Sequence, residues 1–305
     1  MAGTCGLEID TERIGLCRIR QASRGLTFKR GASLPLPPGL VTPSLTEPNV
    51  AEEEALTAEL RRLLKKAGWR RGPVVLTLPD LSCRIGFQDF EELGGTPAEM
   101  RQLLSWRLKD RLPFPIQEAR LDYQPVPSPG NGTRLLYLLT REAIVAQYET
   151  VLATVGLEPV RIITRGVALY RLSQAAGIGG KRLLFAPGPS SLVLIYAEQG
   201  TAQLWRVLPW DDHGTAQDRI HRAERLLQEL RETIGYLRET MGVGEPDGLL
   251  LMGGGNQALA ETVTKGCQLP VHTMPEPGDG FPVDLLTPGG AALLQQAWRP
   301  GWISP

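Results

Sequence analysis

The sequence predicts a duplicated α/β fold with two lobes. The chain has 305 residues, which exceeds the roughly 250–300 residues at which a single hydrophobic core stops growing. Three short strands with tight turns are expected over residues 4–34, and three more with nearly the same spacing over residues 183–208. Ligands of such folds usually bind in the cleft between the lobes.

The first lobe is expected to begin with strands at residues 4–9, 15–20 and 26–34, followed by a proline-rich linker. A helix is expected over residues 50–67, because glutamates crowd its start, lysines and arginines crowd its end, and Gly68 follows. Residues 74–78 form a short apolar run that ends at Pro79, which indicates a buried strand.

The middle of the chain begins with a capping box, Thr96-Pro97-Ala98-Glu99, which predicts the start of a helix. A hairpin is expected from strands at 120–126 and 134–140, then a helix over 141–155 that ends at Gly156. A strand at 158–163 and a helix from about 166 complete this half. The expected apolar stripe of the first of these helices comprises Met100, Leu103, Leu104, Leu108 and Leu112.

The second half is expected to begin with strands at 183–186, 191–197 and 202–208. A long amphipathic helix over about 215–241 follows, then a strand at 248–252, a run of three glycines and a helix from about 258. A last helix is expected to begin at Pro288. The order of elements therefore repeats that of the first half without a repeat of the residues.

The composition excludes several classes of function. Lysine plus arginine and aspartate plus glutamate both total 33, so the overall charge indicates no nucleic-acid partner. The four cysteines form no CxxC pair and the three histidines lack metal-ligand spacing, so no zinc site is expected and the thiols suit a reducing cytosol. No apolar stretch approaches the roughly 20 residues that span a bilayer, so membrane association is expected only through a partner.

Four motifs together resemble the PilM family of type IV pilus assembly proteins. They are Gly6-Leu7-Glu8-Ile9-Asp10, Leu112-Pro113-Phe114-Pro115, Leu121-Asp122-Tyr123 and Leu251-Met252-Gly253-Gly254-Gly255-Asn256. The segment 106–123 is the most specific of these. PilM proteins are similar to the cell-division protein FtsA and, more distantly, to the cytoplasmic part of the secretion protein GspL.

The resemblance implies an actin-like (ribonuclease H-like) fold with an FtsA/PilM-type inserted subdomain. The first lobe would comprise residues 1–80 and 157–180, with a C-terminal helix at 288–297 returning to it. The insert would span 81–156 and the second lobe 181–287. ATP would bind between the lobes.

The family's partner is PilN, a membrane protein whose cytoplasmic tail docks beside the insert. The resemblance thus implies a cytoplasmic scaffold that is peripheral at the inner membrane, with pilus motor ATPases as further partners and no membrane insertion. Trp106 either contacts the partner tail or packs against a neighbouring subdomain. Phe114 either forms part of a docking surface or fills the core of the insert. The expected partner-binding residues are Trp106, Leu112, Phe114, Pro115 and Tyr123.

The nucleotide site departs from the family pattern at both phosphate turns. In the first, Glu8 replaces an aspartate, Asp10 a glycine and Gly15 a lysine. In the second, Phe185 replaces the aspartate that anchors magnesium, and two prolines lack the N–H that a phosphate needs. No cofactor is therefore expected to be required, ATP and magnesium would bind weakly at most, and hydrolysis is not expected. The residues that a retained site would use are Asp10, Thr11, Gly188, Ser190, Glu229, Gly253, Gly254, Gly255 and Asn256.

Some alternatives stay open at this point. Glu8 and Asp10 lie two apart on a strand, so they either bind a cation together or are solvated carboxylates of a turn. The glycine run either contacts adenosine or only lets a helix approach the sheet. For the whole protein, a scaffold is the leading hypothesis, a working actin-fold ATPase is the second, and a sugar or acetate kinase of the same superfamily is the third.

Overall fold

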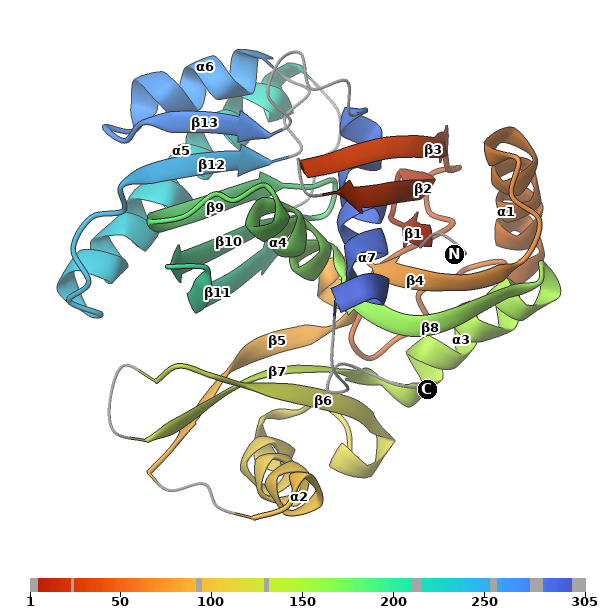
Figure 1. The fold of residues 1–305 in the computed structure, drawn as a ribbon, viewed down its shortest axis with the longest axis horizontal. Helices are drawn as coiled ribbons and strands as arrows, with labels where there is room; N and C mark the ends of the chain where they lie inside the picture. Colours follow the sequence, from red (N-terminus) through yellow and green to blue (C-terminus); the bar gives the residue numbers. More distant parts are fainter. Residues whose placement is uncertain are drawn as a thin grey trace.

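The computed structural model contains three β-sheets in the part of the chain that it describes, one for each lobe and one for an insert (Figure 1). The described residues are 5–22, 25–91, 95–128, 132–209, 216–252, 257–274 and 282–297. Each lobe combines a sheet with helices, which confirms the predicted α/β fold.

The first sheet has the strand order β3-β2-β1-β4-β8. Its members are β1 (Cys5–Ile9), β2 (Arg13–Ala22), β3 (Gly25–Pro35), β4 (Gly72–Leu78) and β8 (Leu157–Thr164). The first three form an antiparallel meander, and β4 and β8 continue the sheet in parallel with β1. Figure 1 shows α1 (Glu53–Ala67) and α3 (Glu142–Thr154) on one face and α7 (Leu286–Ala297) on the other.

The second sheet repeats this pattern with the strand order β11-β10-β9-β12-β13. Its members are β9 (Lys181–Pro187), β10 (Ser191–Glu198), β11 (Thr201–Pro209), β12 (Gly248–Met252) and β13 (Val271–Met274). The predicted duplication is confirmed, since β9 occupies the central position that β1 occupies in the first lobe. The strand β13 was not predicted, because four residues give too short a pattern to recognise.

Helices α5 (Ala216–Glu239) and α6 (Gln257–Gly266) accompany the second sheet. Leucines of α5 and Val263 of α6 pack against Phe185 and Tyr196 in one apolar cluster. The other face of the same sheet, which includes Ala186 and Val193, belongs instead to the core of the first lobe. One hydrophobic core therefore contains residues of both lobes, and the second lobe has a further core of its own beside α5.

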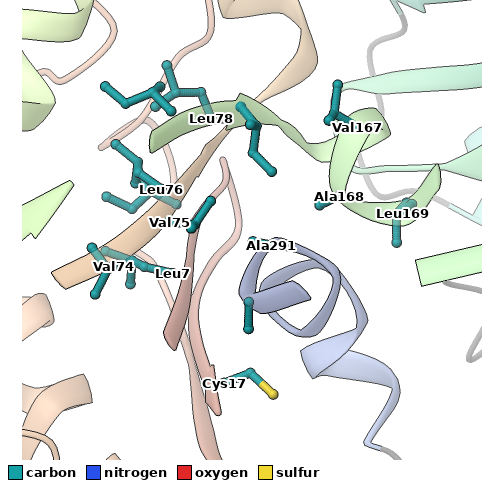
Figure 2. Packing of buried hydrophobic residues seen from close by; sticks show 14 of the residues in the cluster. Leu7, Cys17, Val74, Val75, Leu76, Leu78, Val167, Ala168, Leu169 and Ala291 are labelled. Atoms are coloured by element: carbon teal, nitrogen blue, oxygen red, sulfur yellow. The ribbon is translucent and has the colours of Figure 1, made fainter. Parts of the chain in front are cut away.

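Two helices join the lobes within this shared core. Helix α4 (Arg165–Ala175) follows β8 directly, and α7 packs against α4 as well as against β1, β2 and β4. Figure 2 shows Val167, Ala168 and Leu169 of α4 and Ala291 of α7 among the buried residues of the first sheet. The predicted return of the C-terminal helix to the first lobe agrees with this packing.

The insert is a three-stranded antiparallel sheet of order β5-β7-β6, with α2 (Pro97–Leu108) packed against it. Its strands are β5 (Arg84–Phe90), β6 (Ala119–Val126) and β7 (Thr133–Arg141). The predicted capping box is confirmed: the Thr96 hydroxyl accepts from the Glu99 N–H at 3.3 Å, and the Glu99 carboxylate accepts from the Thr96 N–H at 2.6 Å. The strand β5 was not predicted.

Helix α3 lies with the first lobe rather than with the insert. Its residues Ile144, Val145 and Tyr148 are buried in the core of the first lobe. The inserted sheet and α2 thus span residues 84–141, a shorter range than the expected 81–156. Helix α1 also begins later than expected, because Val50 pairs with Val41 in an extended bridge and the helix starts only at Glu53.

Two negative findings concern the described residues only. None of the helices in these ranges is both long and apolar enough to cross a bilayer. No cluster of three or more histidine, cysteine, aspartate or glutamate side chains in the same ranges could hold a metal ion. The four cysteines are all free thiols.

Candidate functional site

The turn between β1 and β2, which is the first of the two expected phosphate turns, carries two carboxylates that are buried rather than solvated. Glu8 on β1 is 1% exposed, and Asp10, which directly follows the strand, is buried as well. Asp10 accepts a hydrogen bond from the N–H of Thr11 at 2.8 Å. The interpretation of these two residues as solvated carboxylates of a turn was therefore wrong.

Arg13 places a positive charge beside Glu8. Its Nε lies 3.4 Å from the Glu8 carboxylate, and its Nη1 lies 3.7 Å from that of Asp284. Neither Glu8 oxygen has a hydrogen bond of normal geometry within the described residues. Burial raises the pKa of Glu8, with Arg13 opposing the shift and Asp10 adding to it. The turn therefore holds an internal ion pair.

The N-terminus of α4 is occupied by a carboxylate of the protein itself. Asp80 follows β4 and is buried, and its Oδ1 accepts from the Gly166 N–H at 2.8 Å. Helix N-termini are common phosphate-binding positions because their first N–H groups lack partners. Burial raises the pKa of Asp80, while Arg165 and this hydrogen bond oppose the shift.

Arg165, the first residue of α4, binds the second expected phosphate turn, which lies between β9 and β10. Its Nη1 donates to the Ala186 carbonyl at 3.1 Å and its Nη2 to the Pro187 carbonyl at 2.8 Å. Its Nη1 also lies 3.9 Å from Asp80 Oδ2. Arg165 is buried, so this single side chain ties the first lobe to the β9–β10 turn of the second.

The predicted residues of the second turn are used in other ways. Gly188 donates its N–H to the Ser191 carbonyl at 2.8 Å, and a β-carbon at Gly188 would lie only 2.9 Å from Arg165 Nη1. Ser190 is half-buried. Phe185 is fully buried in the apolar cluster that includes leucines of α5. This position therefore offers no oxygen ligand to a magnesium ion.

These residues do not fit a magnesium-bound triphosphate. Such a group needs unoccupied N–H donors and a carboxylate that is open to the metal's hydration shell. Here the Gly166 N–H binds Asp80, the Gly188 N–H binds Ser191, and Glu8 faces Arg13. The Gly166 and Gly188 N–H groups and the Glu8 carboxylate are thus already paired within the protein.

The remaining predicted nucleotide residues lie apart from this network or outside the described ranges. Glu229 on α5 is half-buried and lies 3.5 Å from Arg206 Nη2 of β11, so it pairs within the second lobe. The glycine run and Asn256, which were expected to approach adenosine, lie outside the described residues.

The predicted partner-binding residues divide into buried and accessible groups. Phe114 is 7% exposed and Tyr123 is buried beside it in the core of the insert, where the Tyr123 hydroxyl donates to the Pro97 carbonyl at 2.6 Å. Of the two interpretations of Phe114, the plug of the insert's core agrees with this burial. Leu112 is half-buried and Pro115 is exposed, so these two can still meet a partner.

Trp106 lies on the outer face of α2, not at the margin of its apolar stripe. It is 56% exposed, and Leu103 one turn earlier is 38% exposed. Leu104 and Leu108, each two residues from Trp106, are buried on the opposite face. The guanidinium of Arg107 and the ammonium of Lys109 lie 5.4 and 5.7 Å from the centre of the indole ring.

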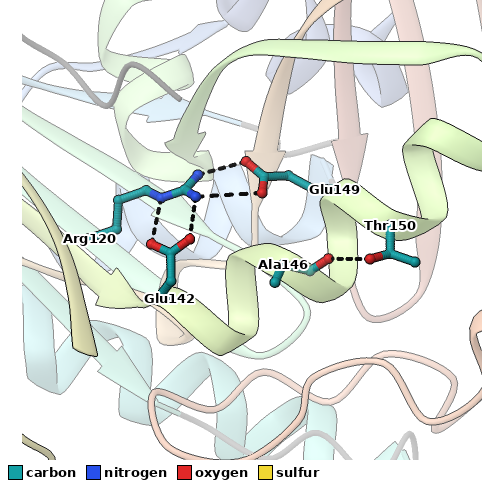
Figure 3. A network of polar contacts seen from close by, with 5 residues as sticks. All are labelled: Arg120, Glu142, Ala146, Glu149 and Thr150. Atoms are coloured by element: carbon teal, nitrogen blue, oxygen red, sulfur yellow. Dashed lines mark hydrogen bonds and ion pairs between the residues drawn. The ribbon is translucent and has the colours of Figure 1, made fainter.

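The insert is fixed to the first lobe by an arginine between two glutamates. Figure 3 shows Arg120 of β6 between Glu142 and Glu149 of α3. Its Nε donates to Glu142 at 2.9 Å and its Nη1 donates to Glu149 at 2.7 Å. One guanidinium that donates to two carboxylates fixes the orientation of the contact as well as its position. The insert is therefore held at a defined angle to α3.

Near this junction, two strands have a hydrogen-bonded neighbour on only one side in the described sheets. β8 is the last strand of the first sheet and β6 the last strand of the insert's sheet. On β6, Arg101 donates to the Leu121 carbonyl and its Nη2 lies 3.6 Å from Asp122, so this edge is partly covered. On β8, Glu158 is exposed and Val160 and Arg161 are half-buried.

Sequence reasoning missed three members of the cleft network: Arg13, Asp80 and Arg165. Asp80 and Arg165 each follow the carboxyl end of a strand that is parallel to β1. Carboxyl ends of parallel strands meet at one edge of a sheet, which is where ligands of open α/β sheets bind. A charged residue directly after each of two apolar strands was thus a signal that could have found them.

Comparisons with known proteins agree with this geometry. No protein-family model matches the chain, and no curated protein matches it. A chain of the PilM–PilN type IV pilus biogenesis complex superposes with a TM-score of 0.78 at 23% identity, over 96% of this chain and 98% of that chain.

Two further solved structures are similar. The cytoplasmic domain of EpsL, an inner-membrane component of the type II secretion system of Vibrio cholerae, has a TM-score of 0.53 at 12% identity, over 96% of this chain and 95% of that one. The ethanolamine utilization protein EutJ of Carboxydothermus hydrogenoformans has a TM-score of 0.52 at 14% identity, over 96% and 90%. The predicted resemblance to PilM, with the GspL-type domain more distant, is confirmed in the fold: this chain has the actin-like fold in the form that PilM takes.

Proposed function

We propose that this chain is a cytoplasmic scaffold of a type IV pilus machine, or of a related type II secretion machine, that docks the tail of a PilN-like inner-membrane protein. The observation that carries the proposal is the superposition on a chain of the PilM–PilN complex over 96% of this chain. The scaffold would be held at the inner membrane by that partner, and pilus motor ATPases are proposed as further partners.

The proposed docking mode is addition of an extended tail to a sheet edge. Such addition uses main-chain hydrogen bonds for affinity and alternate side chains for specificity. The edge of β8 supports this mode better than the edge of β6, because Arg101 already donates to the Leu121 carbonyl on β6. The fixed angle between insert and first lobe, set by Arg120, would present this edge in a constant orientation.

The scaffold is proposed to work without hydrolysing ATP. Support comes from the cleft, where Arg165 donates to two carbonyls of the second turn and Asp80 accepts from the Gly166 N–H of α4. A nucleotide would have to displace these buried contacts, and each displaced buried polar group costs about 1–3 kcal/mol.

Calorimetry with a synthetic PilN-like tail peptide, with and without ATP and magnesium, tests both parts of the proposal. We expect the peptide to bind with the same affinity in both conditions and ATP alone to give no heat of binding. A peptide N-methylated at alternate residues should not bind, because it lacks the donors for strand addition. Tight binding of magnesium-ATP would refute the nucleotide-independent scaffold, and absence of peptide binding would refute the docking.

A separate test asks whether the docked tail extends from the edge of β8 to the insert, where Trp106 is exposed on α2. Trp106→Ala is then expected to weaken tail binding at least fivefold, because tryptophan is enriched among the residues that dominate interfaces. Tyr236→Ala on α5 is the matched control, since Tyr236 is also a largely exposed aromatic residue at 44% but lies in the second lobe. Equal affinities of the two variants would remove Trp106 from the docking surface.

A further inference from the structure

A hollow of about 280 Å³ lies on the first lobe between the β2–β3 hairpin and the C-terminal end of α1. Arg18 of β2, Lys29 and Arg30 of β3, and Trp69, which follows α1, line it together with a few small or apolar residues. None of these residues belongs to the cleft, to the insert or to the edge of β8. The hollow is therefore separate from the proposed docking surface.

The lining is strongly cationic and lacks counter-charges. Among the described residues, Arg18, Lys29 and Arg30 form neither an ion pair within 4 Å nor a side-chain hydrogen bond. The adjoining segment 65–71 adds four lysines and arginines and no carboxylate. Concave sites lined by one sign of charge concentrate ligands of the opposite sign.

Trp69 forms one wall of the hollow. The Arg18 guanidinium lies over its indole ring, 6.0 Å from the centre. The indole Nε1 is itself buried and has no acceptor among the described residues, so it does not face the open space. A ligand in the hollow would thus meet the guanidinium of Arg18 beside the indole ring.

The end of α1 is closed by a glycine cap. The Leu64 carbonyl accepts from the Trp69 N–H at 2.9 Å and the Lys65 carbonyl from the Gly68 N–H at 3.2 Å, and the lysines and arginines of segment 65–71 offset the partial negative charge of the helix C-terminus. Gly68 adopts φ +60°, and a β-carbon there would collide with the Arg30 guanidinium. Glycine therefore both caps the helix and leaves room for Arg30.

We propose that this hollow binds a phosphate group, carried either by a small soluble ligand or by the headgroup of an anionic phospholipid. Guanidinium groups match the planar, paired acceptors of phosphate. The volume is below the roughly 300–1,000 Å³ of pockets that enclose drug-sized ligands, so it suits a phosphate group rather than a whole nucleotide. The proposal does not depend on the docking of a partner tail.

The test follows the indole N–H signal of Trp69 in ¹⁵N–¹H NMR spectra during titration with inorganic phosphate and with glycerol 3-phosphate. The chain has six tryptophans, and the loss of one signal in Trp69→Phe assigns it. In parallel, vesicles of phosphatidylglycerol and of phosphatidylcholine are compared by co-sedimentation with the full chain. Binding of free phosphate esters alone identifies a soluble ligand, and phosphatidylglycerol binding that phosphate displaces identifies a headgroup.

Two variants and a control separate a specific site from general charge. Arg18→Gln/Arg30→Gln should weaken phosphate binding at least tenfold, since one charge-assisted hydrogen bond is worth about 1.5–3 kcal/mol and about 1.4 kcal/mol is tenfold. Trp69→Phe keeps an aromatic wall and every charge, so less than twofold weaker binding is expected, because the buried Nε1 does not reach the ligand. The control Arg61→Gln/Lys265→Gln removes the same charge from exposed positions outside the hollow and should change affinity less than twofold.

The proposal would be overturned by absence of a Trp69 shift together with absence of vesicle binding. Equal losses in the two double variants would overturn it as well, because binding would then reflect net charge alone. Thermal melting of each variant shows whether it folds. If Arg18→Gln/Arg30→Gln is unfolded, the single variant Arg30→Gln decides the outcome, because Arg30 is exposed and its loss should still weaken binding at least threefold, whereas an unchanged affinity would overturn the proposal.

Discussion

Arg165 links the two lobes through a single side chain. From the start of α4 it reaches the second lobe and donates to the carbonyls of Ala186 and Pro187, with Asp80 beside it. The guanidinium is buried, so the link is part of the folded structure.

Arg165→Met is therefore expected to destabilise the protein by about 3–5 kcal/mol, because it leaves a buried carboxylate and two carbonyls without their partner. Arg165→Lys should recover only part of this loss, since an ammonium cannot reach two acceptors in the fork geometry of arginine. Urea denaturation measures both. Arg206→Met is the matched control: it removes a half-exposed pair with Glu229 and should cost no more than about 1 kcal/mol. Equal costs would show that Arg165 does not clamp the lobes.

At the scale of elements, α7 is the helix that packs between the first sheet and α4. It packs against the first sheet at Gly6, where a β-carbon would collide with the Pro288 carbonyl, and against α4 at Gly290, where one would collide with the Ala168 carbonyl. Both obstacles are backbone atoms, which cannot move aside as a flexible side chain can. The first sheet, α4 and α7 can therefore approach one another this closely only because positions 6 and 290 are glycine.

Gly290→Ala should destabilise the protein by about 1–3 kcal/mol through overpacking, although alanine is the better helix former. Gly235→Ala on α5 is the control, because nothing lies within 4 Å of a β-carbon there, and it should stabilise by up to about 1 kcal/mol. Denaturant titrations compare the two. Stabilisation by both substitutions would mean that α7 sits less closely on α4 than the structure shows.

At the scale of the molecule, the lobes share their core instead of meeting across a loose interface. Ala186 and Val193 of the second sheet and Leu7 and Val75 of the first belong to one buried cluster with α4 and α7. Two lobes that share a core should unfold together, since opening one exposes apolar surface of the other. A wide hinge motion of the kind that an ATP cycle drives is not expected.

Hydrogen exchange in increasing urea tests this cooperativity. The amides of β1 and β9, the central strands of the two sheets, should lose protection at the same urea concentration and with the same slope. The edge strand β13 should exchange earlier and serves as the local reference. Loss of protection in β9 well before β1 would show that the lobes are independent units.

Much of this fold could be predicted because its signals are local. Alternating apolar residues predicted the two meanders, the capping box at Thr96 predicted α2, and the repeated order of elements predicted two lobes. The short strands β5 and β13 were missed, since a few residues do not distinguish a strand from a loop. The extent of the insert was overestimated, because which sheet α3 joins depends on contacts with residues far away in the chain.

The sequence by itself determined the order of elements, the duplication and the departures at both phosphate turns, because each is written in neighbouring residues. Only the tertiary structure decided what replaced the lost site. Glu8, Asp80 and Arg165 come from three separate segments, and their burial and mutual distances exist only once β1, β4 and β8 lie side by side. Charge compensation acts through space, so a turn that departs from the family pattern along the chain is, in the folded molecule, part of a buried set of paired charges.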